Sequence, residues 1–195
     1  MSIKKYVFAF LFVAISFTGN AQEYKKEIKT GFSEYLTALT NKDFRKATDY
    51  MMPEIFTLVP KEQLIALMEQ MLNNPTITIE QKNPQIKDVG DAKEIEGKYY
   101  SHVTYSVTIR IKFNAQGEET PEEKANRIEM MKTNLSTAMG AENITYDEET
   151  EFFEVFAERD GYAVSADGKT NWKFIAIEKG QEAILAQILP AELLN

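Results

Sequence analysis

Few side chains in this sequence could carry out acid–base or nucleophilic chemistry. The 195 residues contain one histidine, His102, and no cysteine, which excludes a thiol nucleophile, a disulfide, a thiolate metal site and any site built from two imidazoles. Carboxylates and tyrosine hydroxyls are the groups that remain. The candidate catalytic residues are therefore Asp43, His102, Tyr99 and Tyr105.

Each of these candidates also has a structural explanation. Asp43 stands where a short helix is expected to begin, so its carboxylate can cap that helix instead of acting as a base. His102 falls on the polar side of a long strand, where it serves as a general base only if that side lines a pocket. Tyr99 and Tyr105 fall on the apolar side, where tyrosines more often belong to the core than donate a proton to an enolate-like oxygen. No complete Asp–Tyr or His–Asp catalytic pattern is present in the sequence.

Acidic residues gather between positions 147 and 151. Asp147, Glu148, Glu149 and Glu151 offer the oxygen ligands that calcium prefers, but their spacing matches no standard calcium loop. A solvated, charged connection between elements explains this run better. The sequence also has no phosphate-binding glycine loop, serine-nucleophile motif or zinc spacing. We therefore expect no metal site and no cofactor.

The N-terminal end has the pattern of an export signal. Two lysines precede an apolar run from Tyr6 to Phe17, and small residues up to Ala21 follow. This pattern predicts a signal peptide at residues 1–21, since the run is shorter than the roughly 20 apolar residues of a membrane-spanning helix. We expect an exported protein, periplasmic or extracellular and soluble after cleavage, in which residues 22–195 form a single domain without a membrane span.

The charge of the chain restricts its partners. The formal charge is −8, and removal of the two signal lysines with no acid takes it to −10. Nucleic acids and anionic membranes attract positive charge, so neither is an expected partner. A small apolar ligand, another envelope protein or a second copy of this chain fits the composition better.

Helical periodicity dominates the first third of the expected domain. Apolar residues at helical spacing predict a helix over 23–39. Thr40 and Asp43 have the spacing of a capping box and predict a second, short helix through about Tyr50. Pro60 suits the first turn of a third helix. The apolar stripe of that helix consists of Leu64, Leu67, Met68 and Met71, and the methionines at 68, 71, 130, 131 and 139 are expected to fill the core.

From residue 76 the pattern alternates with a period of two, which predicts strands. The clearest strand is 99–113, whose odd positions are mainly apolar and whose even positions are polar, as in an antiparallel sheet covered on one side. Its length predicts that it bends across a core. Shorter strands are expected over 76–80, 152–157 and 172–177, and residues 162–166 either continue the strand 152–157 or form a second one. Asp160-Gly161 and Asp167-Gly168 have the composition of turns.

Two further helices complete the expected order of elements. Thr120, Pro121 and Glu123 supply a cap, a first-turn proline and a capping-box glutamate for a helix over 120–139, which interrupts the strands. A closing helix is expected over 181–189. The fold class is therefore α+β: N-terminal helices packed on a curved antiparallel sheet, with an inserted helix and a C-terminal helix.

This order of elements resembles the nuclear-transport-factor-two-like superfamily, cone-shaped α+β domains in which N-terminal helices close one side of a curved sheet. The segment from Tyr35 to Phe44 is similar to its first helix, polar turn and second short helix. The segment from Asp167 to Phe174 is similar to its final turn and Trp-x-hydrophobic strand. The resemblance covers about 23–113 and 152–178. The helix over 120–139 and the closing helix depart from the pattern, and a cystatin-like architecture is the nearest alternative.

Three functions follow from the sequence and the resemblance. The first is a non-catalytic exported domain that binds a small apolar molecule, a peptide or an envelope protein. The second is an isomerase or dehydratase of the ketosteroid-isomerase-like kind, which the resemblance implies with Asp43 as an acid and tyrosines as donors. The third is an oligomerising subunit that pairs through the polar sheet face at Thr104, Ser106 and Thr108.

Overall fold

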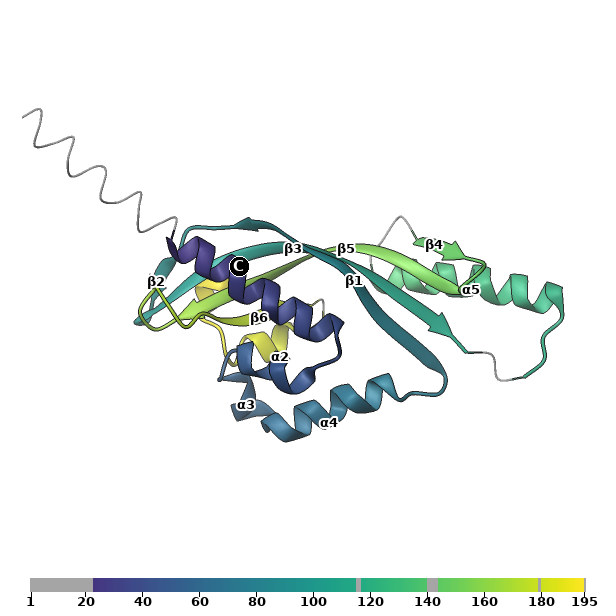
Figure 1. Cartoon of the computed structure of the whole chain (residues 1–195), viewed down its shortest axis with the longest axis horizontal. Coiled ribbons are helices and arrows are strands. Elements are labelled where there is room, and N and C mark those ends of the chain that lie inside the picture. The colour runs from purple at the N-terminus through teal and green to yellow at the C-terminus, as the bar shows by residue number, and fades with distance from the viewer. Residues whose placement is uncertain (1–22, 115–116, 140–143, 179, 195) are drawn as a thin grey trace, which may run out of the picture.

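The protein is an elongated α+β molecule in which long strands connect two helical ends (Figure 1). The computed structural model describes residues 23–114, 117–139, 144–178 and 180–194. The expected signal peptide, residues 1–21, lies outside the described residues. In the described ranges, no helix is long and apolar enough to cross a membrane.

The N-terminal helices gather at one end of the molecule (Figure 1). They are a helix over residues 23–40, α2 (Phe44–Tyr50), α3 (Ile55–Leu58) and α4 (Lys61–Leu72). The predicted capping box is wrong in one respect, because the Thr40 hydroxyl donates to the Leu36 carbonyl at 2.9 Å within the first helix. The Asp43 carboxylate alone caps α2, accepting a hydrogen bond from the Lys46 N–H at 3.1 Å. Helix α3 was not expected, because four residues are too short to show a helical period.

In the described residues, six strands form one antiparallel sheet. They are β1 (Ile77–Val89), β2 (Lys93–Ile95), β3 (Lys98–Phe113), β4 (Ile144–Asp147), β5 (Phe152–Ser165) and β6 (Lys173–Ile177). The long strands β3 and β5 pair in the centre of the sheet. Strands β1 and β2 share the far side of β3, and β4 and β6 share the far side of β5. The predicted fold class is confirmed.

The structure corrects the strand boundaries around Asp160-Gly161. This dipeptide forms no turn and lies inside β5, so residues 162–166 continue the strand 152–157, which is the first of the two alternatives. Gly161 pairs with Val103 on one side and Ala176 on the other. A glycine is present because the β6 backbone approaches closely there, not because the chain reverses. The turn at Asp167-Gly168 is confirmed, with Gly168 at φ +67°.

The inserted and C-terminal helices lie at different places on the sheet. Helix α5 (Pro121–Met139) has the expected capping box, since the Glu123 carboxylate accepts from the Thr120 N–H at 2.8 Å and the Thr120 hydroxyl accepts from the Glu123 N–H at 3.3 Å. The closing helix α6 (Glu182–Leu185) is shorter than predicted. Beyond it the chain tightens into i→i+3 hydrogen bonds and a 3₁₀ turn, Ala191–Leu193.

The two sides of the sheet are covered differently. Odd-numbered residues of β3, such as Val103 and Tyr105, pack on the N-terminal helices, and Ile111 farther along the same side packs under α5. Ile109 contacts both of these clusters. The C-terminal segment covers the opposite side of the sheet near the start of β3. There Leu185 and Leu189 pack against Tyr100, Val164 and Ile175. On β3 itself, the even-numbered residues after Tyr100 are polar, and Ser106 is the buried one among them.

Candidate functional site

An apolar cleft opens where α4 runs beside β1. Its volume is about 170 Å³, and it is bounded by the end of the N-terminal helix, the start of α2, α4 and β1. The cleft lies where Ile79 and Gln81 pair with Ile111 and Ile109, at the boundary between the two helical layers on this side of the sheet. Its apolar walls are Leu39, Phe44, Met68, Met71, Leu72 and Ile79, and its polar border is Thr40, Lys42, Glu80 and Gln81.

Helix α4 supplies half of the apolar wall because it is only shallowly packed. Ile65 is its one buried side chain, and Met71 is 59% exposed. The inward side of α4 follows Leu64, Ile65, Met68 and Leu72, so the predicted stripe is rotated and leaves Leu67 exposed. The expectation that the methionines fill the core is therefore wrong for Met71 and also for Met130 on α5, which is 54% exposed. An exposed methionine offers a flexible apolar surface to a ligand.

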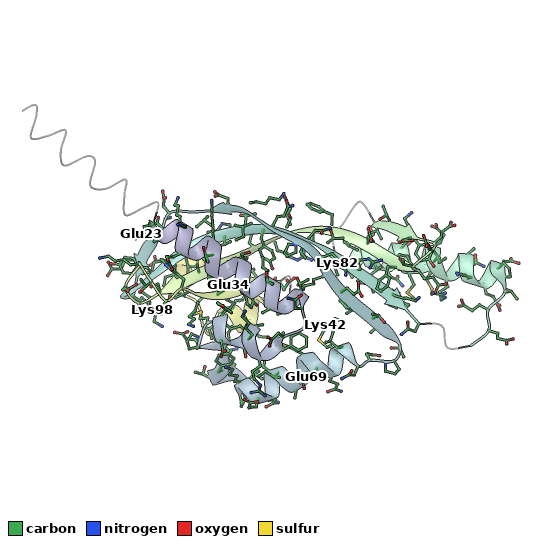
Figure 2. The ribbon with its side chains drawn as sticks, in the orientation of Figure 1. Glu23, Glu34, Lys42, Glu69, Lys82 and Lys98 are labelled. Atoms are coloured by element: carbon green, nitrogen blue, oxygen red, sulfur yellow. The ribbon has the colours of Figure 1, made fainter. Side chains whose placement is uncertain are left out.

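The border of the cleft includes a lysine in an unusual backbone conformation. Lys42 has φ +62° and stands directly after the N-terminal helix. Its N–H donates to the Leu39 carbonyl at 3.0 Å, and the Asp43 N–H donates to the Ala38 carbonyl at 2.9 Å, which together form a Schellman motif. Glycine is the usual residue at this left-handed position, and a side chain there costs roughly 1–2 kcal/mol. Figure 2 shows Lys42 at the end of this helix, over α4.

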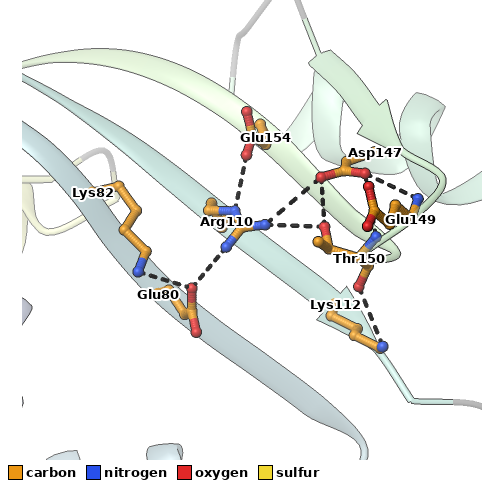
Figure 3. A network of polar contacts seen from close by, with 8 residues as sticks. All are labelled: Glu80, Lys82, Arg110, Lys112, Asp147, Glu149, Thr150 and Glu154. Atoms are coloured by element: carbon orange, nitrogen blue, oxygen red, sulfur yellow. Dashed lines mark hydrogen bonds and ion pairs between the residues drawn. The ribbon is translucent and has the colours of Figure 1, made fainter.

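Glu80 lies on the β1 wall, and two cations already compensate its charge. The Arg110 guanidinium donates to Glu80 Oε2 at 3.0 Å, and Lys82 Nζ lies 3.5 Å from the same oxygen (Figure 3). Arg110 also donates to Glu154 at 2.9 Å and to the Thr150 hydroxyl at 3.0 Å. This network connects β1, β3 and β5 to the turn after β4, so it braces the sheet beside the cleft.

A second ion-pair group anchors α5 to the sheet. Glu151 lies 2.6 Å from Lys124 Nζ of α5 and 3.0 Å from Lys112 Nζ of β3. Hydrogen bonds from Lys124 and then Lys112 lower the pKa of Glu151 from its ordinary 4.5 to about 2. Glu151 therefore stays ionised in the folded protein far below the pH at which it takes up a proton in the unfolded chain.

The ion pairs of Glu151 predict that the protein loses part of its stability in acid. Since the pKa of Glu151 is lower in the folded state, its pairs stabilise the protein above pH 4.5, and the stabilisation is lost as the pH falls through about 2. Glu151→Gln should lower the free energy of unfolding by about 1 kcal/mol at pH 7, and the difference should vanish near pH 2. Melting temperatures of both proteins between pH 7 and pH 2 measure this. Parallel curves over that range would contradict it.

The acidic run before Glu151 has a structural role. Asp147 Oδ1 accepts hydrogen bonds from the N–H groups of Glu149 and Thr150 at 3.0 and 3.2 Å, and Thr150 Oγ1 donates to Asp147 Oδ2 at 2.7 Å. These bonds lower the pKa of Asp147 and close the turn between β4 and β5. In the described part of the chain, no three carboxylate or imidazole groups are placed to hold a metal ion.

Two of the sequence-predicted site residues perform structural roles. Asp43 caps α2, as the alternative explanation proposed. The Tyr99 hydroxyl donates to Glu94 at 3.1 Å, which raises the pKa of that phenol. A Cβ added to Gly168 would lie 2.7 Å from the Tyr99 ring, so this ring supports the turn between β5 and β6.

Tyr105 is part of the core between helices and sheet. Its ring lies 5.1 Å from that of Phe32, which in turn lies 5.2 Å from Phe174. Burial raises the pKa of Tyr105, and it raises the pKa of the neighbouring Tyr35 to about 12. Aromatic rings therefore fill the space between the N-terminal helices and the sheet around Tyr105.

His102 lies on the side of β3 that the N-terminal helices do not cover. Its Nε2 is 3.1 Å from Asp160 Oδ1, and the Thr104 hydroxyl donates to the same oxygen at 3.2 Å. The side chains of His102 and Asp160 are 46% and 54% exposed. The structure therefore does not bring His102 together with Tyr105, which points to the other side of the sheet, or with Asp43 on α2.

The residues of the cleft were not among the sequence candidates. Leu39, Phe44 and Met68 are indistinguishable by type from core residues, and pairing in the sheet decides which residues of β1 border the cleft. One signal in the sequence does indicate this region. The N-terminal helix is followed by Asn41-Lys42, so the position of its C-terminal cap lacks the usual glycine.

Comparisons with known proteins assign no family to this chain. No family model and no curated protein matches the chain. Among solved structures, the chain is similar to a conserved protein from Planctomyces limnophilus DSM 3776, with a TM-score of 0.40 and 13% sequence identity. The match covers 78% of this chain and 97% of that chain.

Proposed function

We propose that the protein is an exported binding domain that holds a small apolar group in the cleft between α4 and β1. The observation that carries this proposal is an open apolar cleft with an exposed methionine at its edge. An engineered cavity of about 150 Å³ takes up benzene, so a cleft of 170 Å³ has room for about six carbon atoms. The occupied core around Tyr105 supports placing a ligand here and not between the helices and the sheet.

Other parts of the expectation rest on observations outside the cleft. Export rests on the pattern of residues 1–21, and a nuclear-transport-factor-two-like architecture rests on the helix-first order and the curved sheet. Binding to another envelope protein and dimer formation through the polar sheet face stay predictions. The burial of Ser106 removes one of the three hydroxyls that were expected to line such a dimer interface.

The binding proposal is tested by observing the methionines directly. The processed protein is labelled with ¹³C in its methionine methyl groups and titrated with octan-1-ol, a neutral apolar probe. The methyl signals of Met68 and Met71 should shift and saturate, while that of Met130 should stay unchanged. If Met68 and Met71 do not respond, or if every methionine responds equally, the cleft is not a binding site.

A pair of variants separates the cleft from general surface hydrophobicity. Met71→Glu should weaken octanol binding about tenfold or more, because a carboxylate at the edge of the cleft opposes burial of an apolar ligand. Met130→Glu is the matched control, because it replaces the same residue type at similar exposure outside the cleft. The signal of Met68 reports binding in both variants. Equal weakening by the two substitutions would refute the proposal.

A further inference from the structure

Lys42 is the cationic side chain among the residues that border the cleft, and its ammonium is free to meet a ligand. Within the residues the structure describes, this ammonium has no ion pair and no side-chain hydrogen bond. The neighbouring acids are already engaged. Glu80 is bound by Arg110 and Lys82, and Asp43 accepts from the backbone of α2. A negatively charged group entering the cleft therefore meets an uncompensated positive charge.

The backbone conformation of Lys42 supports a role for its side chain. The left-handed position of the Schellman motif is strained for lysine and unstrained for glycine. Neither the capping hydrogen bonds nor the packing around them needs a side chain at this position, because both bonds are made by the backbone. Strain that the fold does not require is an indication of function when the side chain lies at a cleft.

We propose that the cleft binds a small amphiphilic carboxylate, with its hydrocarbon part against Met68, Met71 and Ile79 and its carboxylate at the Lys42 ammonium. This inference rests on the proposed function and adds the chemical class of the ligand. A single ammonium at the border matches a single negative charge. The cleft volume accepts about six carbons, and longer chains extend from its open side to solvent.

The experiment compares octanoate with octan-1-ol in the wild type and three variants, below the concentrations at which micelles form. Lys42→Gly removes the ammonium without harming the cap, and its melting temperature should rise above that of the wild type. Its affinity for octanoate should fall about fivefold, as expected for loss of a partly exposed ion pair, while its affinity for octanol stays the same. Added salt should weaken octanoate binding to the wild type and leave octanol binding unchanged.

Lys46→Gln is the matched control for net charge. Lys46 is exposed on α2, four residues from Lys42, and does not border the cleft. This variant should bind octanoate as the wild type does. Lys42→Gln serves as a second variant at position 42 and keeps a side chain at the strained position. The methyl shifts of Met68 and Met71 report binding in the wild type and in all three variants.

The possible results separate this inference from the function on which it rests. Octanol binding with no loss of octanoate affinity in Lys42→Gly and Lys42→Gln overturns the carboxylate ligand and leaves the apolar cleft in place. An equal loss of octanoate affinity in Lys46→Gln also overturns the carboxylate ligand, because the change in net charge would then explain the effect. Failure of both probes to shift Met68 and Met71 refutes the proposed function itself.

Discussion

Replacing Phe174 by alanine is expected to lower the free energy of unfolding by about 3–5 kcal/mol. Phe174 is 0% exposed, and its ring contacts Phe32 and Tyr35 at centroid distances of 5.2 and 6.2 Å. A Cβ added to Gly31 would lie 3.0 Å from this ring, so the N-terminal helix packs directly on it. Neighbours held this closely cannot collapse into the space that the ring leaves, and a cavity adds its cost to the lost burial.

Urea denaturation followed by the fluorescence of the single tryptophan, Trp172, measures this effect. Phe156→Ala is the matched control, since Phe156 is 57% exposed on β5 and should change the free energy of unfolding by less than about 0.5 kcal/mol. Similar losses for Phe174→Ala and Phe156→Ala would contradict the assignment of the core to the side of the sheet that the N-terminal helices cover.

Replacing Gly161 by valine is expected to lower the free energy of unfolding by more than about 3 kcal/mol and to detach β6 from β5. A Cβ at this position would lie 2.7 Å from the Ile175 carbonyl oxygen, a distance that real contacts do not show. The obstructing atom belongs to the backbone of β6, so no side-chain rotation relieves the contact. Gly161→Ala should show the same effect at about 1–3 kcal/mol, because its single methyl group requires a smaller strand displacement.

Gly90→Ala is the control for Gly161, because its Cβ would meet the His102 carbonyl oxygen at an ordinary 3.4 Å. Gly90→Ala should leave the free energy of unfolding nearly unchanged. Hydrogen exchange should show faster exchange of β6 amides, Lys173–Ile177, in the Gly161 variants while the pairing of β1 with β3 stays protected. If Gly161→Val is as stable as Gly90→Ala, then Asp160-Gly161 is a turn after all and β5 is not continuous.

Local signals in the sequence predicted those elements whose stability comes from neighbouring residues. The capping box of Thr120 and Glu123 and the Asp167-Gly168 turn appear as expected, because each depends on contacts within a few residues. The alternation over 99–113 is also confirmed, because a long strand covered on one side repeats the same pattern many times. Strands β2 and β4 were missed. They contain three and four residues, and they are held in place by β3 and β5, which are their partners in the sheet.

The candidate site was less predictable from the sequence than the fold. Asp43, His102, Tyr99 and Tyr105 were selected by residue type, and the structure distributes them over a helix cap, an exposed strand face, a turn support and the core. The cleft is lined by apolar side chains of the same types that form the core, so residue type cannot distinguish the two. Whether Met71 is buried depends on which layer covers α4, and that is a property of the assembled fold.

By itself the sequence determined the class of the fold, the order of most elements and the few functional groups available for chemistry. Composition sets those groups, and the local periodicity that predicts the elements is a property of nearby residues. The tertiary structure alone decided which side of the sheet is covered, where the covering layers stop, and that Lys42 meets an apolar cleft at that boundary. Those features arise when Leu39, Met68 and Ile79, far apart in the chain, come together, and only packing between elements sets their positions.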